Sequence, residues 1–113
     1  MADRLDYFEF PSSDRAGSNG FFRAAFGWTM TSYGPDYDAI GGAGIDGGID
    51  QSAERVAATM AVVRTDDLDA AEARVVAAGG VITREQFDFP GGRRFHCREP
   101  GGNELAVYVA RPE

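Results

Sequence analysis

The chain has a single histidine, His96, and it lies between two arginines in the sequence RFHCR. Alternation along a β-strand would place Arg94 and Arg98 on the same face as the imidazole. Phe95 and Cys97 would then point to the opposite face. We favour a solvated strand face as the interpretation of this pattern. The alternative is a functional site, in which His96 acts as a general base or hydrogen-bonding group and the arginines hold an anionic group.

Two glutamates, Glu9 and Glu104, are the other candidates for acid–base chemistry. A carboxylate enclosed in a cavity has a raised pKa and can serve as an acid or a base. We expect instead that each carboxylate reaches solvent or pairs with an arginine such as Arg64. Catalysis by either glutamate is kept as the alternative.

Several reaction classes are excluded by what the sequence lacks. There is no lysine for a Schiff base, no nucleotide-binding glycine motif and no serine nucleophile elbow. The single cysteine, Cys97, excludes an intrachain disulfide and a cysteine-based zinc cluster. Its position in the alternation predicts a buried structural thiol.

Composition indicates a small globular protein. The 113 residues are 43% hydrophobic, and the net charge of -7 with a pI near 4.6 makes nucleic-acid binding unlikely. No apolar stretch is long enough to cross a membrane, and no apolar run precedes Leu5, so we expect no signal peptide. We therefore expect a cytoplasmic protein whose partner is a small molecule.

The elements that must position these residues can be predicted from periodicity and from capping residues. Asp14 and Asp67 are placed to cap helices, and Gly27 and Gly79 to end them. The predicted helices are 15–26 and 68–78; the predicted strands are 4–10, 28–33, two short strands within 37–50, then 57–63, 81–85 with a segment at 87–89, 93–97 and 104–110.

The order of elements repeats. Asp14 and Asp67 are separated by 53 positions, and so are Gly27 and Gly80. This spacing predicts a tandem pair of βαβββ modules, 1–52 and 53–113, within one domain of 1–113. The fold class is α+β, with a curved mixed sheet around a concave cavity and helices on its outer face.

This arrangement resembles the vicinal oxygen chelate superfamily, which includes glyoxalase I, bleomycin-resistance proteins and extradiol dioxygenases. The resemblance is carried by YFEFPSSD and GFFRAAFGW in the first half and by TDDLDAAEARVVAAGG and EPGGNELAVY in the second. A tandem ferredoxin-like regulatory domain is the structural alternative. The superfamily implies a divalent metal held by side chains from four strands, which polarises oxygens of the substrate.

The resemblance also implies where those ligands would stand, and here the chain departs from the pattern. The positions correspond to Tyr7, to its repeat counterpart Met60, and to Ala106. The remaining position falls in GIDGGID, at Asp46, Gly48 or Asp50. A thioether and a methyl group cannot hold a hard cation, and a neutral tyrosine is a poor ligand. We therefore expect no metal and no cofactor.

What remains is a surface suited to binding. Met and aromatic side chains favour adaptable contact with a planar ligand. We expect an apolar floor with polar groups that orient the ligand, and a homodimer, although a single chain has both modules needed to close a cavity. The floor is predicted to be Tyr7, Met60, Ala106 and Tyr108; the orienting groups are Glu9, Arg64 and Glu104; and Phe87, Phe89 and Trp28 supply further aromatic surface, Trp28 by packing on the first helix.

Three functions are consistent with this surface. The first is a metal-independent protein that binds a small aromatic or amphipathic molecule. The second is a glyoxalase-like lyase or isomerase that uses Glu9, Glu104 or His96 for acid–base chemistry. The third is a regulatory or interaction domain whose cavity is filled by its own side chains.

Overall fold

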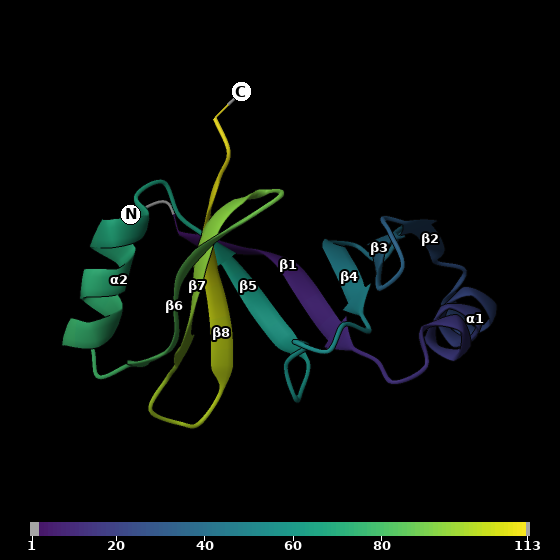
Figure 1. The fold of residues 1–113 in the computed structure, drawn as a ribbon, viewed down its shortest axis with the longest axis horizontal. Helices are drawn as coiled ribbons and strands as arrows, with labels where there is room; N and C mark the ends of the chain where they lie inside the picture. Colours follow the sequence, from purple (N-terminus) through teal and green to yellow (C-terminus); the bar gives the residue numbers. More distant parts are fainter. Residues whose placement is uncertain (1–2, 113) are drawn as a thin grey trace. The chain divides into compact units, whose positions relative to one another are not determined.

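The computed structural model describes residues 3–112 and contains, in that range, eight strands and two helices (Figure 1). The elements are β1 (Arg4–Pro11), α1 (Arg15–Phe26), β2 (Thr29–Ser32), β3 (Tyr37–Gly41), β4 (Asp46–Asp50), β5 (Met60–Arg64), α2 (Leu68–Ala77), β6 (Val81–Phe89), β7 (Gly92–Arg98) and β8 (Glu104–Ala110).

The chain forms two compact units, each with one helix. The first unit is Tyr7–Met60; the second is Ala61–Glu113 together with the N-terminal residues Met1–Asp6. The division falls within β1. Both units have the element order expected for a βαβββ module, so the predicted tandem α+β fold is confirmed.

In the first unit the strand order is β2-β3-β4-β1. β1 and β4 are parallel, whereas β3 is antiparallel to both β2 and β4. α1 begins at Asp14, whose side chain accepts a hydrogen bond from the Gly17 amide, and ends at Gly27, which has the left-handed φ of 74°. Both capping residues were predicted from the sequence.

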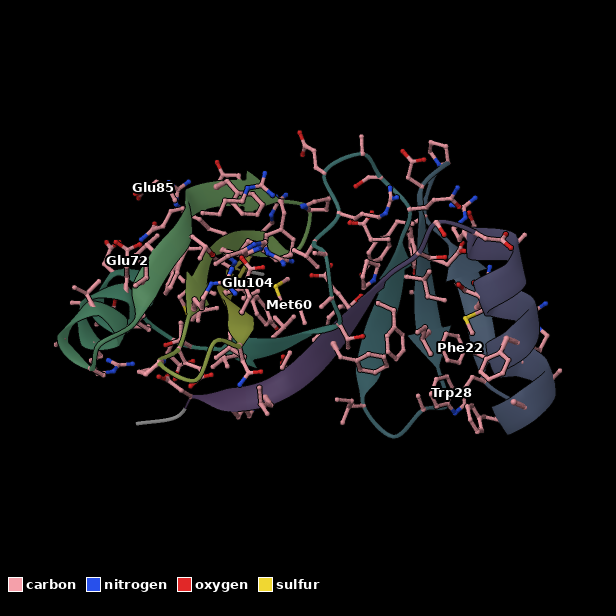
Figure 2. All side chains as sticks on the ribbon, turned by 90° about the horizontal axis from the view of Figure 1, so that it is seen from below. Phe22, Trp28, Met60, Glu72, Glu85 and Glu104 are labelled. Carbon is pink, nitrogen blue, oxygen red and sulfur yellow. The ribbon has the colours of Figure 1, made fainter. Side chains whose placement is uncertain are left out.

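An aromatic stack joins α1 to the strands. Phe22 stacks on Phe10 of β1, with ring centroids 5.1 Å apart, and on Trp28, also at 5.1 Å. Phe22 and Trp28 lie side by side in Figure 2. Phe26 adds a contact with Trp28 at 5.2 Å. The prediction that Trp28 packs on the first helix is confirmed.

A buried carboxylate fastens the other end of α1. Asp38 of β3 is 3% exposed and accepts a hydrogen bond from the Asn19 side chain at 2.7 Å. Its Oδ2 atom also lies 3.2 Å from Nε of Arg15. Such pairing is what a buried charge requires, and it explains how α1 docks although none of its residues is fully buried.

In the second unit the strand order is β5-β8-β7-β6. β5 and β8 are parallel, and β7 is antiparallel to both of its neighbours. α2 begins at Asp67, which accepts from the Ala70 amide, and covers one face of these strands. The core between helix and strands consists of Leu68, Ala71, Phe95, Cys97 and Val107, with Val63, Val75, Ile82, Leu105 and Val109 packed around it.

Two predicted boundaries are wrong. β5 begins at Met60, whereas the sequence suggested a strand from residue 57. β6 is a single strand over Val81–Phe89, where the sequence suggested one strand followed by a separate segment. Its pairing with β7 shifts between Ile82 and Arg84 and again between Arg84 and Phe87. Such irregularities change the direction of side chains within a continuous strand.

None of the helices described over 3–112 is long and apolar enough to cross a membrane.

Candidate functional site

Each unit has an open face, defined here as the strand face opposite its helix. In the first unit Phe10 packs on α1, so alternation along β1 assigns Tyr7 and Glu9 to the open face. In the second unit Leu105 and Val107 pack beneath α2, which assigns Glu104, Ala106 and Tyr108 to the open face. The sequence analysis assigned these residues to one binding surface, and that assignment stays a prediction.

Tyr7 is engaged within the first unit. Its hydroxyl group forms a hydrogen bond with the hydroxyl of Tyr37 on β3. Both hydroxyls lie over Gly48 of β4, where an added Cβ would stand 1.8 Å from the Tyr37 oxygen and 2.8 Å from the Tyr7 oxygen. Gly48 therefore makes room for the tyrosine pair, because a larger side chain there would have to displace the Tyr37 hydroxyl.

The position in GIDGGID that faces Tyr7 can now be assigned. β4 pairs with β1 so that Tyr7 is opposite Asp46, Glu9 opposite Gly48 and Pro11 opposite Asp50. Of these three β4 residues, Gly48 is the one that lies against the Tyr7 hydroxyl. Among the three candidates for the remaining ligand position, Gly48 is thus the one shown against Tyr7, and it has no side chain.

Two further positions are buried and apolar. Ala106 of β8 is 0% exposed and Met60 of β5 is 2% exposed. Alternation puts Met60 on the same side of β5 as Val62, which pairs with Ala106. Neither side chain has an oxygen or nitrogen donor for a cation.

The chemistry of this donor set does not fit a divalent metal. Hard cations need several oxygen or imidazole ligands, whereas these positions offer a hydrogen-bonded phenol, a glycine, a thioether and a methyl group. Among the residues described, no group of three or more His, Cys, Asp or Glu side chains is arranged to hold an ion.

His96 and Arg94 form a buried pair on the open face of the second unit. His96 is 5% exposed and Arg94 is 9% exposed. Nε2 of His96 lies 3.2 Å from Nε and 2.9 Å from Nη2 of Arg94. A guanidinium only donates hydrogen bonds, so Nε2 is the acceptor and the ring proton is on Nδ1.

This finding corrects the solvated strand face that the sequence favoured. Of the three polar side chains on this face of β7, Arg94, His96 and Arg98, only Arg98 is exposed. Burial lowers the pKa of His96 to about 4, and the positive charges of Arg94 and Arg84 act in the same direction, opposed by Glu104. The imidazole is therefore neutral near pH 7 and cannot be a cationic binding group.

Aromatic rings from β6 surround this pair. Phe87 meets the His96 ring edge-on at 5.6 Å, and the guanidinium carbon of Arg84 lies 3.7 Å from the Phe87 centroid. The guanidinium carbon of Arg94 is 5.7 Å from Phe87 and 5.4 Å from Phe89. Stacking of cations on ring faces stabilises positive charge in a desolvated place.

Tyr108 marks one end of the same face. It packs edge-on against Phe89 at 6.0 Å and donates a hydrogen bond to Oδ2 of Asp6 at 2.8 Å. Burial and then Asp6 raise the pKa of the Tyr108 hydroxyl to about 12, with a smaller opposing effect from Arg64. The phenol is therefore a stable hydrogen-bond donor across the physiological pH range.

Glu104 marks the other end. Its Oε2 atom accepts a hydrogen bond from the Thr83 hydroxyl at 2.7 Å. The sequence analysis had considered solvent or an arginine as its partner and had not suggested this threonine. Glu9 is half-buried on the open face of the first unit. Cys97 is 3% exposed and belongs to the core under α2, which confirms the predicted buried thiol.

Sequence reasoning missed three members of these arrangements: Tyr37, Asp6 and Thr83. Tyr37 reaches Tyr7 across β4, Thr83 reaches Glu104 across β7, and Asp6 reaches Tyr108 from β1. Strand register decides such meetings, and register cannot be read from one strand alone. The presence of glycine at position 48 was the available signal for Tyr37, since a glycine inside a strand marks a close approach.

Comparisons with known proteins agree with this fold. Residues 8–108 match the family described as a glyoxalase-like domain. No curated protein sequence matches the chain.

Several solved structures of differently named proteins are similar to this fold. One is a glyoxalase/bleomycin resistance protein/dioxygenase superfamily member from Vibrio splendidus 12B01, with a TM-score of 0.73 and 16% identity, covering 96% of this chain and 99% of that chain. Methylmalonyl-CoA epimerase from Mycobacterium tuberculosis has a TM-score of 0.72 and 14% identity, covering 96% and 88%.

The Mn(II)-bound glyoxalase from Novosphingobium aromaticivorans has a TM-score of 0.68 and 18% identity, covering 96% of this chain and 41% of that chain. At such identities the likeness shows the fold alone, and the activities remain those of the other proteins. The match over 8–108 covers most of the chain and agrees with the tandem βαβββ architecture. This chain therefore belongs to the glyoxalase-like domain family of the vicinal oxygen chelate superfamily.

Proposed function

We propose that this protein binds a small aromatic or amphipathic molecule without a metal ion. The observation that carries the proposal is the open face of the second unit. There Phe87 packs on His96, the strand partner of Ala106, and Phe89 packs on Tyr108; the superfamily resemblance implies a metal ligand at position 106.

The side chains on this face are suited to a planar ligand. Phe87 and Phe89 offer ring surface for stacking, while the Tyr108 hydroxyl and Arg64 supply polar contacts. Ala106 is fully buried and adds no polar group to this face. A few polar groups that set orientation above an apolar floor are typical of small-molecule sites.

Independence from metal is supported by the donor set. A structural neighbour contains Mn(II), whereas the ligand positions that the superfamily resemblance implies for this chain are taken by Tyr7, Gly48, Met60 and Ala106. Substituting the ligands of a metal site removes its affinity outright, because no remaining group can balance the desolvation of the ion. An apolar floor at this place favours a ring over a cation.

The test combines metal analysis with ligand binding. Protein purified without chelators is analysed for manganese, nickel and zinc, then titrated by calorimetry with 2-naphthoate and 2-naphthamide as planar probes. We expect at most about 0.1 metal ion per chain and saturable binding of at least one of the two probes. Stoichiometric metal, or no binding of either probe, would contradict it.

Acid–base catalysis remains a second candidate because Glu104 lies on the same face as the buried His96, close enough to oppose the lowering of its pKa. The reaction to assay is turnover of the methylglyoxal–glutathione adduct by metal-free protein. Catalysis that survives chelation and is lost in Glu104→Gln would favour the enzyme. No turnover, together with probe binding, would favour the binding protein.

A further inference from the structure

We infer that two copies of this chain pair along β2, the outer strand of the first unit, so that the sheet of one copy continues into the sheet of the other. This interaction surface is independent of the proposed ligand. It gives the homodimer expected from the sequence a definite interface and a definite register. The inference is carried by the pairing of β2 with β3 and by the side chains of β2 and its flanks.

One side of β2 has no strand against it. β2 stands at the end of the strand order, with β3 as its one neighbour in the sheet described over 3–112 (Figure 1). The Tyr33 amide donates to the Tyr37 carbonyl at 2.9 Å. Along an antiparallel strand, backbone groups point alternately towards and away from the neighbour, so those of Thr31 also face β3. The N–H and C=O groups of Met30 and Ser32 therefore point out of the sheet.

β2 also lacks the features that usually keep an edge strand from pairing, which are charged side chains, proline and bulges. Residues 28–34, WTMTSYG, contain neither a charged side chain nor a proline, and the register with β3 is unbroken over Thr29–Ser32. The other edge strand, β6, has two register shifts and the charged residues Arg84, Glu85 and Asp88. β2 is therefore the edge that is open to a second strand.

A second copy of β2 fits this edge because the strand is complementary to itself. With a two-fold axis at Thr31, Met30 lies opposite Ser32 of the second copy in an antiparallel pair. Each such pair exchanges two hydrogen bonds, and the symmetry supplies the pair twice. All the outward backbone groups of Met30 and Ser32 are then satisfied. An axis at Met30 would leave those of Ser32 without that partner.

The side chains favour the same register. Thr29, Thr31 and Tyr33 share one face of β2 by alternation, and all are exposed, Tyr33 by 68%. With the axis at Thr31, Tyr33 lies opposite Thr29 of the second copy, and Thr31 lies opposite itself. These are non-hydrogen-bonded pairs, in which side chains approach most closely. Aromatic–β-branched and threonine–threonine pairs of this kind stabilise a sheet.

Charge is consistent with self-pairing. The chain has a net charge of -7, so most contacts between two copies bring like charges together. Pairing along β2 brings only uncharged side chains of residues 28–34 to the axis. The strand has four residues, so the contact is smaller than a standard interface and the dimer should be weak.

The first experiment measures association by sedimentation at pH 7.5. The unmodified protein should show a monomer–dimer equilibrium with a dissociation constant of about 10 to 200 µM. Thr31→Lys should weaken the dimer at least about tenfold, because two ammonium groups then meet at the axis. Val81→Lys is the matched control, since Val81 is a 64% exposed β-branched residue on the β6 edge. It should change the constant by less than about twofold.

Mixing two variants tests the two-fold axis. Thr31→Glu should also dimerise poorly by itself, because two carboxylates then meet. An equimolar mixture of Thr31→Glu and Thr31→Lys should form a heterodimer at least as tightly as the unmodified protein does. Charge pairing can restore association only if residue 31 of one copy meets residue 31 of the other. No restoration in the mixture would contradict this register.

Hydrogen exchange of the unmodified protein gives a test that does not depend on whether the variants fold. The amides of Met30 and Ser32 should exchange rapidly in dilute protein and become protected as the concentration rises through the dissociation constant. The Thr31 amide, which faces β3, should be protected at both concentrations. Protection of Met30 and Ser32 that does not depend on concentration would contradict the pairing.

The remaining outcomes would also overturn the inference. A protein that stays monomeric up to about 500 µM does not pair along β2. Loss of the dimer in Val81→Lys would place the interface at β6. A dimer unchanged by Thr31→Lys and lost in Phe21→Ser would place it on α1, where the Phe21 ring is 60% exposed.

Discussion

Gly48 lies directly beneath the hydroxyl group of Tyr37, so closely that a Cβ atom at position 48 would stand 1.8 Å from that oxygen. The hydroxyl of Tyr7 pairs with the hydroxyl of Tyr37. The two tyrosines therefore meet over a stretch of backbone that has no side chain of its own.

Gly48→Ala should therefore destabilise the first unit. The added methyl group must displace the Tyr37 ring, which costs about 1 to 3 kcal/mol of unfolding free energy in a packed site. Denaturant unfolding measures the change. Gly20→Ala is the control: it lies in α1 with no atom within 4 Å of the added Cβ, so it should stabilise by up to about 1 kcal/mol. Equal effects of the two substitutions would contradict the close contact.

Stability should depend on pH through His96. The pKa is about 4 in the folded state, against 6.5 for an ordinary histidine. The unfolded chain therefore takes up the proton first, and stability falls as the pH decreases from 6.5 towards 4. Below pH 4 this loss of stability is complete, and it amounts to about 3 kcal/mol of unfolding free energy.

His96→Gln provides the comparison for that pH dependence. Glutamine does not titrate, so the fall in unfolding free energy between pH 6.5 and 4 should be smaller in the variant than in the parent protein. Titration of carboxylates will continue to affect both proteins below pH 5 or so. Parallel stability curves over the whole range would show that the folded-state pKa of His96 is normal.

The two helix caps should be energetically similar because they occupy repeated positions. Asp14 accepts from the Gly17 amide at 3.0 Å, and Asp67 accepts from the Ala70 amide at 3.0 Å. Asp14→Ala and Asp67→Ala should each lower the unfolding free energy by about 0.5 to 2 kcal/mol. Asp66→Ala, at an exposed position beside the second cap, is the control and should have little effect.

Cys97 should react slowly with thiol reagents in the native protein. It is 3% exposed, and burial raises its pKa, with a further contribution from Glu104. Both effects reduce the amount of accessible thiolate. Ellman's reagent should detect one thiol in denaturant and almost none on the same timescale without it. Rapid reaction of the native protein would place Cys97 outside the core.

Much of the fold could be predicted because its signals are local. Asp14, Gly27 and Asp67 cap their helices as expected, and the spacing between the halves indicated the repeat. Alternation also separated Cys97 from His96 correctly. The prediction from alternation failed at β6. The sequence suggested a break before Phe87, whereas the strand runs on to Phe89 with two shifts in its register against β7.

The site was less predictable because burial depends on packing between strands. His96 and Arg94 were expected to be solvated. In the structure Phe87 packs against the imidazole, and the Arg94 guanidinium donates a hydrogen bond to Nε2. Neither contact follows from the polar character of β7. Alternation along the strand predicted the face on which each residue lies. The partner and the exposure of each residue depend on the register of β6 on β7, which alternation does not give.

The most direct measurement of the central claim is calorimetric titration of chelator-treated protein with 2-naphthoate, repeated after addition of Mn²⁺ or Zn²⁺. Metal-free binding predicts a saturable isotherm with one ligand per chain and a dissociation constant that changes by less than about twofold when metal is added. An isotherm that appears only in the presence of metal would contradict it.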